Sequence, residues 1–477
     1  MEPDESGGRR QRRSGPRSKK GYLTCRGRHT RCDEARPVCG NCRKSRLKCQ
    51  LPEFVSSKWG STLTQPGMET GRAVGIEAPP ERNAAGQATE THQVAEPSGK
   101  SGPFANSEVP APVPTGSMMM TAEIAHLLRV YEKGIATWMD VFDSDLTYQR
   151  SLLCLVPSSP LLLNAICALA ARQLSLTAPS PLTWTPVAEH YYGQAVHLLA
   201  RLLNDYPSKM ELAIVGTVLL SSYELLAFPG LDYQRHFKGT NTIINSIHAY
   251  KSESCLTRAS FWIYARHEVA EALNRSSPTL QDPGLWPKFD LSEAAGAPTE
   301  DSVCNEVLRL SAETVCFVFR KLSRGQRKKG RARELSSLQD ELDNWQHLCP
   351  SQWRGIQYEE EDGNIRYWFP RPNFAAGLVF YHLSMLLLCD ERKKVQQGSE
   401  GVNELLDRVD AHSRQIIQIA LSHIPDSAIV VIVQPLCYAA RHVRDTRLRA
   451  EAILLLDNIE KRTGFHTRSK LDRQLSI

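Results

Sequence analysis

The sequence lacks the apolar segments that direct chains into or across membranes. Its first twenty residues are polar and basic, so we expect no secretory leader. The longest aliphatic run, AIVVIV at 428–433, stops at Gln434-Pro435, far short of the roughly 20 residues that a spanning helix needs. Without a leader, a disulfide framework is not expected from the thirteen cysteines. We therefore expect no membrane partner.

Catalytic signatures are missing as well. The chain has no P-loop, no G-x-S-x-G and no DDxxD-type acidic motif. HEVAE at 267–271 begins like the helix of a zinc protease but lacks its second histidine. We therefore expect that the chain is not an enzyme. A helical enzyme with a basic targeting tail is an alternative that only measured activity on some substrate class would support.

Charge is concentrated at one end of the chain. Residues 1–50 contain 15 Lys and Arg against 5 Asp and Glu, a balance of +10, and the remainder contains 43 against 47, a balance of −4. A basic head on a mildly acidic body predicts a polyanionic partner for the head alone. RRQRR at 9–13 and RSKK at 17–20 fit a nuclear-import address or phosphate contacts, the alternative being a solvated tail.

Composition divides the chain into four parts. Residues 1–20 are predicted to be a disordered basic tail, and residues 21–50 contain a cysteine cluster. Residues 51–117 hold nine prolines, eight glycines and no apolar periodicity, so they are predicted to be a disordered linker, which as a flexible coil would span roughly 45 Å. Residues 118–477 show helical periodicity and are predicted to form a large all-α domain. No leucine heptads follow the cluster, which leaves the oligomeric state open.

Apolar periodicity places the expected helices. Residues 124–142 repeat apolar side chains at steps of three and four, which predicts an amphipathic helix capped by Thr121. The segment 159–176 starts with Ser159 and Pro160, which suits a helix start, and is apolar nearly all round, which predicts deep burial. Further helices are expected near 186–204, 209–227, 257–274, 302–322, 335–348, 372–390, 402–423 and 446–462.

Several polar or aromatic stretches are predicted to be structural. DGNIRYWFP at 362–370 is the best extended or hairpin-like piece, and YEEED at 358–362 is expected to be a solvated acidic turn. RGQRKKGRAR at 324–333 is expected to be an exposed loop, with a second import signal as the alternative. One group is expected to supply core packing and structural hydrogen bonds instead of a ligand site: Trp262, Tyr264, Arg266 and His267.

Five cysteines lie close together near the start of the chain. They follow the spacing C-x6-C-x6-C-x2-C-x6-C and are Cys25, Cys32, Cys39, Cys42 and Cys49. Thiolates bind zinc tetrahedrally, and a C-x2-C step lets one turn present two sulfurs to one ion. A loop of this size cannot form a hydrophobic core, so metal must supply its folding free energy. The other eight cysteines are scattered through apolar contexts and are predicted to be small buried hydrophobic residues.

The stretch LTCRGRHTRCDEARPVCGNCRKSRLKC resembles the fungal binuclear zinc-cluster transcription factors. In that family six cysteines, in two C-x2-C-x6-C halves joined by a proline-containing loop, hold two zinc ions, and the first and fourth cysteines bridge both ions. The resemblance implies that the second to sixth of these ligands are Cys25, Cys32, Cys39, Cys42 and Cys49, with Cys39 bridging. Tyr22 stands where the first cysteine should be.

The tyrosine at position 22 bears on how many zinc ions are held. Two tetrahedral ions need eight ligand positions, and removal of a bridging cysteine vacates one position on each ion. A phenol with a pKa of about 10 is a poor substitute at neutral pH, whereas water could fill both positions. We expect a weaker cluster with two loosely held zinc ions or only one. The alternative is that another group compensates for the missing thiolate.

The resemblance also implies how the cluster contacts double-stranded DNA. The helix after the second cysteine would enter the major groove with Arg26, Arg28, His29 and Arg31, and CGG-containing sites are expected. The family usually has Arg or Lys where His29 stands, so the guanine preference is expected to be weaker. Arg43 and Lys44 resemble the second helix, which contacts phosphates.

Segments of the helical body resemble the regulatory domain that follows the cluster in many of these factors, among them 159–175, 233–244 and 260–273. That region is helical and modulates activity through partners, self-association or an inducer. The sequence therefore predicts a nuclear, zinc-dependent, sequence-specific regulator of genes transcribed by RNA polymerase II, such as those of a metabolic pathway or gene cluster. Transcription co-regulators and a second copy of the chain are further expected partners. The alternative is a degenerate member that acts through its helical domain as a protein-interaction regulator.

Overall fold

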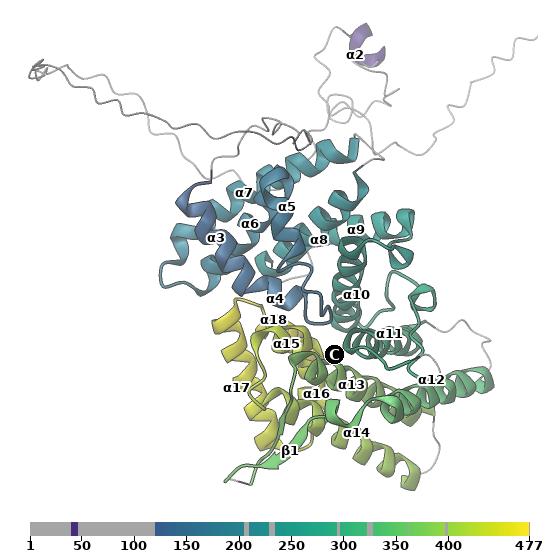
Figure 1. The fold of residues 1–477 in the computed structure, drawn as a ribbon. Coiled ribbons are helices and arrows are strands. Elements are labelled where there is room, and N and C mark those ends of the chain that lie inside the picture. The colour runs from purple at the N-terminus through teal and green to yellow at the C-terminus, as the bar shows by residue number, and fades with distance from the viewer. Residues whose placement is uncertain are drawn as a thin grey trace, which may run out of the picture. The chain divides into compact units, whose positions relative to one another are not determined.

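The computed structural model describes residues 40–45, 120–204, 209–228, 234–292, 296–321, 328–361, 363–395 and 399–476. The chain divides into two units between Ser107 and Glu108. The described part of the first unit consists of the short helix α2 (Gly40–Lys44) and Ser45. The second unit is a large helical domain (Figure 1).

The helical domain confirms the predicted all-α fold class. Its helices in chain order are α3 (Ala122–Lys133), α4 (Ile135–Met139), α5 (Ser151–Leu155), α6 (Pro160–Thr177), α7 (Pro181–Asn204), α8 (Met210–Ala227), α9 (Gln234–Ile247), α10 (Cys255–Arg275), α11 (Glu300–Phe319), α12 (Lys328–Leu348), α13 (Pro372–Val395), α14 (Ser399–Ala420), α15 (Asp426–Ile429), α16 (Val433–His442), α17 (Thr446–Thr463) and α18 (Arg468–Ser476). The strands among the described residues, β1 (Ile356–Glu359) and β2 (Ile365–Trp368), form an antiparallel hairpin in which Ile356 faces Trp368 and Glu359 faces Ile365.

Local sequence signals explain where several helices begin. The Leu162 backbone N–H donates to the Ser159 hydroxyl (3.4 Å) at the start of α6, and Pro160 occupies the first helical position, as predicted. The Thr121 hydroxyl likewise accepts from the Ile124 N–H (3.2 Å) at the start of α3. These side chains satisfy N–H groups that have no partner inside the helix.

The single helix predicted over residues 124–142 is wrong, because the chain breaks at Gly134 into α3 and α4. Gly134 has φ −108° and ψ −103°. A Cβ there would lie 2.8 Å from Oε1 of Gln173 on α6 and 2.9 Å from the Val130 carbonyl oxygen. The break therefore depends on a close approach to another helix, which periodicity cannot reveal.

Within the described part of the chain, three helices, α6, α8 and α13, are long and apolar enough to cross a membrane by length and composition. The longest aliphatic run, 428–433, lies outside these three helices and therefore gives no indication of them. In the structure, 61%, 72% and 94% of their apolar windows are buried inside the domain. Helix α6 packs against α3, α7 and α8, while α13 packs against α11 and α14.

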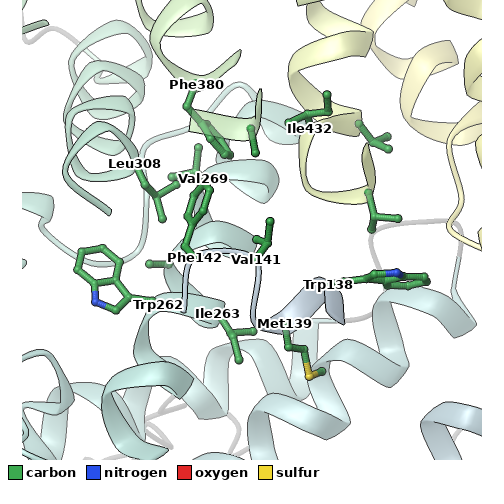
Figure 2. Packing of buried hydrophobic residues seen from close by; sticks show 14 of the residues in the cluster. Trp138, Met139, Val141, Phe142, Trp262, Ile263, Val269, Leu308, Phe380 and Ile432 are labelled. Carbon is green, nitrogen blue, oxygen red and sulfur yellow. The ribbon is translucent and has the colours of Figure 1, made fainter. Parts of the chain in front are cut away.

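The first and last helices of the domain meet around α10. Helix α4 contacts α15, α6 contacts α17, and α10 contacts both α8 and α16 (Figure 1). The loop after α4 carries Phe142, whose ring meets the Phe380 ring of α13 edge to face at a centroid distance of 6.1 Å (Figure 2). The core is thus continuous from the N-terminal helices to the C-terminal ones.

The sequence did not predict α5, α9, α15, α16 and α18. The reason is clearest for α16, because Gln434-Pro435 ends the apolar run 428–433 in the sequence. Pro435 instead lies in the first turn of α16, where its missing N–H has no intrahelical acceptor to lose.

Two predictions for polar segments need correction. In YEEED (358–362), Tyr358 and Glu359 belong to β1, and Glu360 forms an ion pair with Arg366 of β2 (3.1 Å), so the segment is not simply a turn. In RGQRKKGRAR (324–333), residues 328–333 form the start of α12, and residues 324–327 lie outside the described part of the chain. This part is therefore helical and not a loop, and Arg331 within it forms an ion pair with Glu391 of α13 (2.6 Å).

Burial of the scattered cysteines is confirmed in most cases. Cys167, Cys304, Cys349, Cys389 and Cys437 are buried in the domain, and Cys316 is half-buried. Cys154 and Cys255 are exposed, so the prediction is wrong for them. Cys154 lies on the short helix α5, and Cys255 is the first residue of α10. Both positions leave the side chain exposed to solvent.

A pair of buried histidines joins α13 to α14. The Nδ1 atoms of His382 and His412 lie 3.0 Å apart, so one ring donates a hydrogen bond to the other. Burial and the neighbouring His412 lower the pKa of His382 to about 3. Burial and the charge of Arg408 lower the pKa of His412 to about 4.

We predict that acid destabilises the domain through this pair. A histidine in the unfolded chain takes up a proton near pH 6.5, whereas the folded pair resists protonation until about pH 4. The contribution of the pair to the stability of the domain is therefore complete above pH 6.5 and is lost as the pH falls below that value. Between pH 7 and pH 5 the loss should be about 2 kcal/mol for each histidine. Urea unfolding at both pH values should show that His412→Gln loses less unfolding free energy between pH 7 and pH 5 than the wild type does. His190→Gln, which changes an exposed histidine and serves as the control, should lose as much as the wild type. An equal pH dependence in all three proteins would contradict the assignment.

Candidate nucleic-acid interface

Helix α2 buries one cysteine and exposes the basic residues that follow it in the sequence. Cys42 is fully buried, whereas Arg43, Lys44 and Ser45 are exposed. Successive residues on a helix point about 100° apart, so one short turn can direct a thiol inward and two cations outward. The turn therefore presents the two predicted chemistries, metal ligation and anion contact, on different sides.

The two cations of α2 lie in its last turn. The carbonyl groups at a helix C-terminus carry partial negative charge, which favours Lys and Arg there. Their exposure leaves both side chains able to reach an anion such as a phosphate.

The structure places only part of the predicted site. Cys42, Arg43 and Lys44 are described, and their burial and exposure fit the predicted roles. The remaining candidates lie outside the described residues: Tyr22, Cys25, Arg26, Arg28, His29, Arg31, Cys32, Cys39 and Cys49. The predicted tail (1–20) and linker (51–117) also lie outside the described part of the chain.

The donor chemistry of α2 fits zinc. A sulfur ligand that is withdrawn from solvent while its neighbours face outward is suited to a soft divalent ion, and the ion would balance the charge of a buried thiolate. Among the described residues, α2 included, no group of three or more His, Cys, Asp or Glu side chains is arranged to hold a metal ion.

The aromatic and basic segment of α10 largely behaves as predicted. Trp262 and Tyr264 are buried in the core, and Arg266 donates hydrogen bonds to the backbone carbonyls of Trp138 and Met139. Sequence patterns missed one feature, a cavity beside Arg266 and His267. Its lining comes from segments far apart in the sequence, so no local motif could indicate it.

Comparison with known protein families identifies both units. Residues 126–473 match the family described as the fungal specific transcription factor domain. Residues 23–58 match the fungal Zn(2)-Cys(6) binuclear cluster domain, a match that implies zinc binding. Members of such transcription factor families bind DNA and are generally not enzymes. No solved structure matches the chain significantly.

Two curated proteins are similar to parts of the chain. Adhesion and hyphal regulator 1 of Candida albicans is 58% identical over 33 residues, which cover 7% of this chain and 5% of that protein. Transcription activator AMTR1 of Alternaria alternata is 23% identical over an alignment of 478 residues, which covers 72% of this chain and 62% of that protein. The chain thus spans less than two thirds of the length of either relative.

We predict that Cys42→Ser lowers the zinc content of the full-length protein, because a serine hydroxyl cannot replace a thiolate as a zinc ligand at neutral pH. Ser45→Ala changes an exposed residue of the same segment and should leave the zinc content unchanged. Elemental analysis of the purified chains measures both. Equal zinc per chain in the wild type and Cys42→Ser would rule out Cys42 as a ligand.

Proposed function

Because this chain belongs to the family of fungal specific transcription factor domains, we propose that it is a nuclear, zinc-dependent transcription regulator that binds double-stranded DNA sequence-specifically. We propose that its targets are genes transcribed by RNA polymerase II, such as those of a metabolic pathway or gene cluster, and that it has no enzymatic activity. One observation carries the proposal: helix α2 buries a cysteine and exposes two cations within a segment similar to zinc-cluster DNA-binding modules.

We propose four functional regions: a basic tail (1–20), a zinc-cluster module (21–50), a linker (51–117) and a regulatory domain (118–477). The basic tail would serve nuclear import, and the linker would tether the module to the domain. For the regulatory domain we propose co-regulators and a second copy of the chain as partners, on the strength of the family resemblance.

The zinc ligands we propose are Cys25, Cys32, Cys39, Cys42 and Cys49. Bound zinc would supply folding free energy by cross-linking these thiolates, since so short a segment cannot bury an adequate core. Two ions are proposed from the family pattern, or one where the position of Tyr22 leaves a ligand missing. The burial of Cys42 supports its place in this set.

The DNA contacts we propose divide into two groups. Arg26, Arg28, His29 and Arg31 would reach base edges in the major groove of CGG-containing sites, because arginine suits the acceptor pair of guanine. Arg43 and Lys44 would contact phosphates, which position the module without reading sequence. The exposure of both α2 cations supports the second assignment.

We predict that DNA affinity falls steeply with salt, because each phosphate neutralised by a cation releases counterions. Arg43→Gln and Lys44→Gln should each weaken binding to CGG and scrambled duplexes alike and reduce the salt slope by about 1. Arg320→Gln removes an exposed cation of the helical domain and serves as the matched control. Fluorescence anisotropy with labelled duplexes, with and without a zinc chelator, measures these effects. An affinity that is insensitive to both salt and chelator would overturn the proposal.

We predict that Tyr22→Cys raises both the zinc content and the zinc affinity of the full-length protein, because it restores a thiolate at a bridging position of the family pattern. Zinc per chain and competition with a chromogenic chelator measure the change. A wild-type chain that already holds two ions as tightly as the variant would show that another group compensates for Tyr22.

A further inference from the structure

A cavity lies inside the helical domain at the junction of its early and late helices. Its wall is formed by α4, α6, α8 and α10 from one side and by the start of α16 and the segment after α17 from the other. Its empty volume, including the part open to solvent, is about 650 Å³. Figure 1 shows how α4 and α10 approach the late helices of the chain around this junction.

Most of the cavity wall is apolar. Trp138 and Met139 contribute from α4, Leu169 from α6, Leu225 from α8, Ala270 from α10, and Phe465 from the segment that follows α17. Figure 2 shows Trp138 and Met139 beside buried residues of the core such as Val141 and Ile263. Concave, largely apolar sites bind small organic molecules when a few polar groups converge on them.

Two polar groups of the wall lack hydrogen-bond partners among the described residues. Gln434 is only 4% exposed, and its Oε1 atom is buried without a partner. Nδ1 of His267 is likewise buried without a partner. Both residues line the cavity. Buried polar atoms are usually satisfied, so these two wall residues are positions where a bound molecule could supply a missing hydrogen bond.

Arg266 adds a buried positive charge to the same wall. Its guanidinium donates to the backbone carbonyls of Trp138 and Met139 and lies 5.4 Å from the centre of the Phe142 ring. Asp140 and Asp143 are near enough to favour its charge, but among the described residues neither forms an ion pair with it. Burial lowers the pKa of Arg266 to about 10, so the side chain stays charged at neutral pH.

His267 differs from its neighbour in charge. Burial, helped by the positive charges of Arg266 and Lys470, lowers the pKa of His267 to about 3. The ring is therefore neutral and offers either a donor or an acceptor according to its tautomer. The wall thus combines an acceptor on Gln434, an adaptable ring on His267 and a cation on Arg266.

We propose that this cavity binds a small, largely apolar organic molecule whose polar end carries oxygen, a carboxylate or a hydroxyl group, and that this end engages Gln434, His267 and Arg266. A hydroxyl would donate to Oε1 of Gln434, whereas a carboxylate would balance the charge of Arg266. The apolar body would contact Trp138, Met139 and Leu169. Because the wall joins early and late helices, the bound molecule stabilises their junction.

Binding at this junction gives a route to regulation. A molecule that binds one arrangement of the helices more tightly than another shifts the domain towards that arrangement. The role of the molecule as an effector of transcription rests on the proposed function. Its binding to the cavity does not, and it can be measured without DNA.

The test uses the full-length protein with octanoate and 1-octanol as probes, which share an eight-carbon chain and differ in the polar end. We expect saturable quenching or enhancement of tryptophan emission that Trp138→Phe reduces, and a melting temperature that rises with probe concentration. A response to octanoate alone assigns a carboxylate ligand, a response to octanol alone a hydroxyl ligand, and a response to both supports the shared chemistry.

Two variants localise the binding. Ala270→Leu places a larger side chain into the cavity and should abolish the response, whereas Ala332→Leu makes the same change at an exposed position of α12 and should preserve it. Gln434→Leu should weaken octanol binding about tenfold through loss of one hydrogen bond. Circular dichroism of each variant checks that the fold is retained. No saturable response to either probe, or equal binding by the wild type and a folded Ala270→Leu, would overturn the proposal.

Discussion

The helical domain depends on the burial of α6, α8 and α13, which are apolar around most of their circumference. Such helices cannot lie on a surface with one face in water, so amphipathic helices such as α3 and α14 must surround them. This requirement brings the two ends of the domain together, since α6 contacts α17 while α13 contacts α15 and α16. It also withdraws the polar groups on these helices from solvent and so requires partners for them inside the protein.

Most buried polar groups of the domain meet that requirement. Arg309 is buried on α11, yet its guanidinium lies 2.6 Å from carboxylate oxygens of both Glu306 and Glu313. This compensation is what a buried charge needs, because an unpaired one is strongly destabilising. Arg266 on α10 is comparably buried but has only carbonyl and ring contacts, and two orphan polar atoms lie on the same cavity wall. Orphan polar atoms also occur away from the cavity, for example on Asn274 and Trp286, so it is their position beside Arg266 on one wall that marks the cavity.

The parts that could be predicted from sequence are those that local chemistry decides. Ser159 and Pro160 mark the start of α6 because capping needs only neighbouring residues, and the apolar composition of α6 predicts its burial. The break at Gly134 and the helical turn containing Pro435 could not be predicted, because tertiary contacts and position within the helix decide them. The cavity could not be predicted from the sequence either, because residues from distant segments form its wall. For the zinc module, the spacing of the cysteines carries the prediction. Cys42, Arg43 and Lys44 are its described residues, and all of the zinc ligands, Cys42 included, stay predictions.

The proposed zinc module and the helical domain would rely on different forces, and this would limit how one can regulate the other. In the proposed module of about thirty residues, thiolate–metal bonds would fix the shape through ligand geometry. The helical domain is held by apolar burial, and the cavity between its early and late helices is a place where that packing is incomplete. A ligand in that cavity would therefore alter the surfaces that the domain offers to partners and leave the coordination of the DNA-binding module intact. Regulation through the domain would then change the set of proteins with which the regulator assembles more than the DNA sequence that it binds.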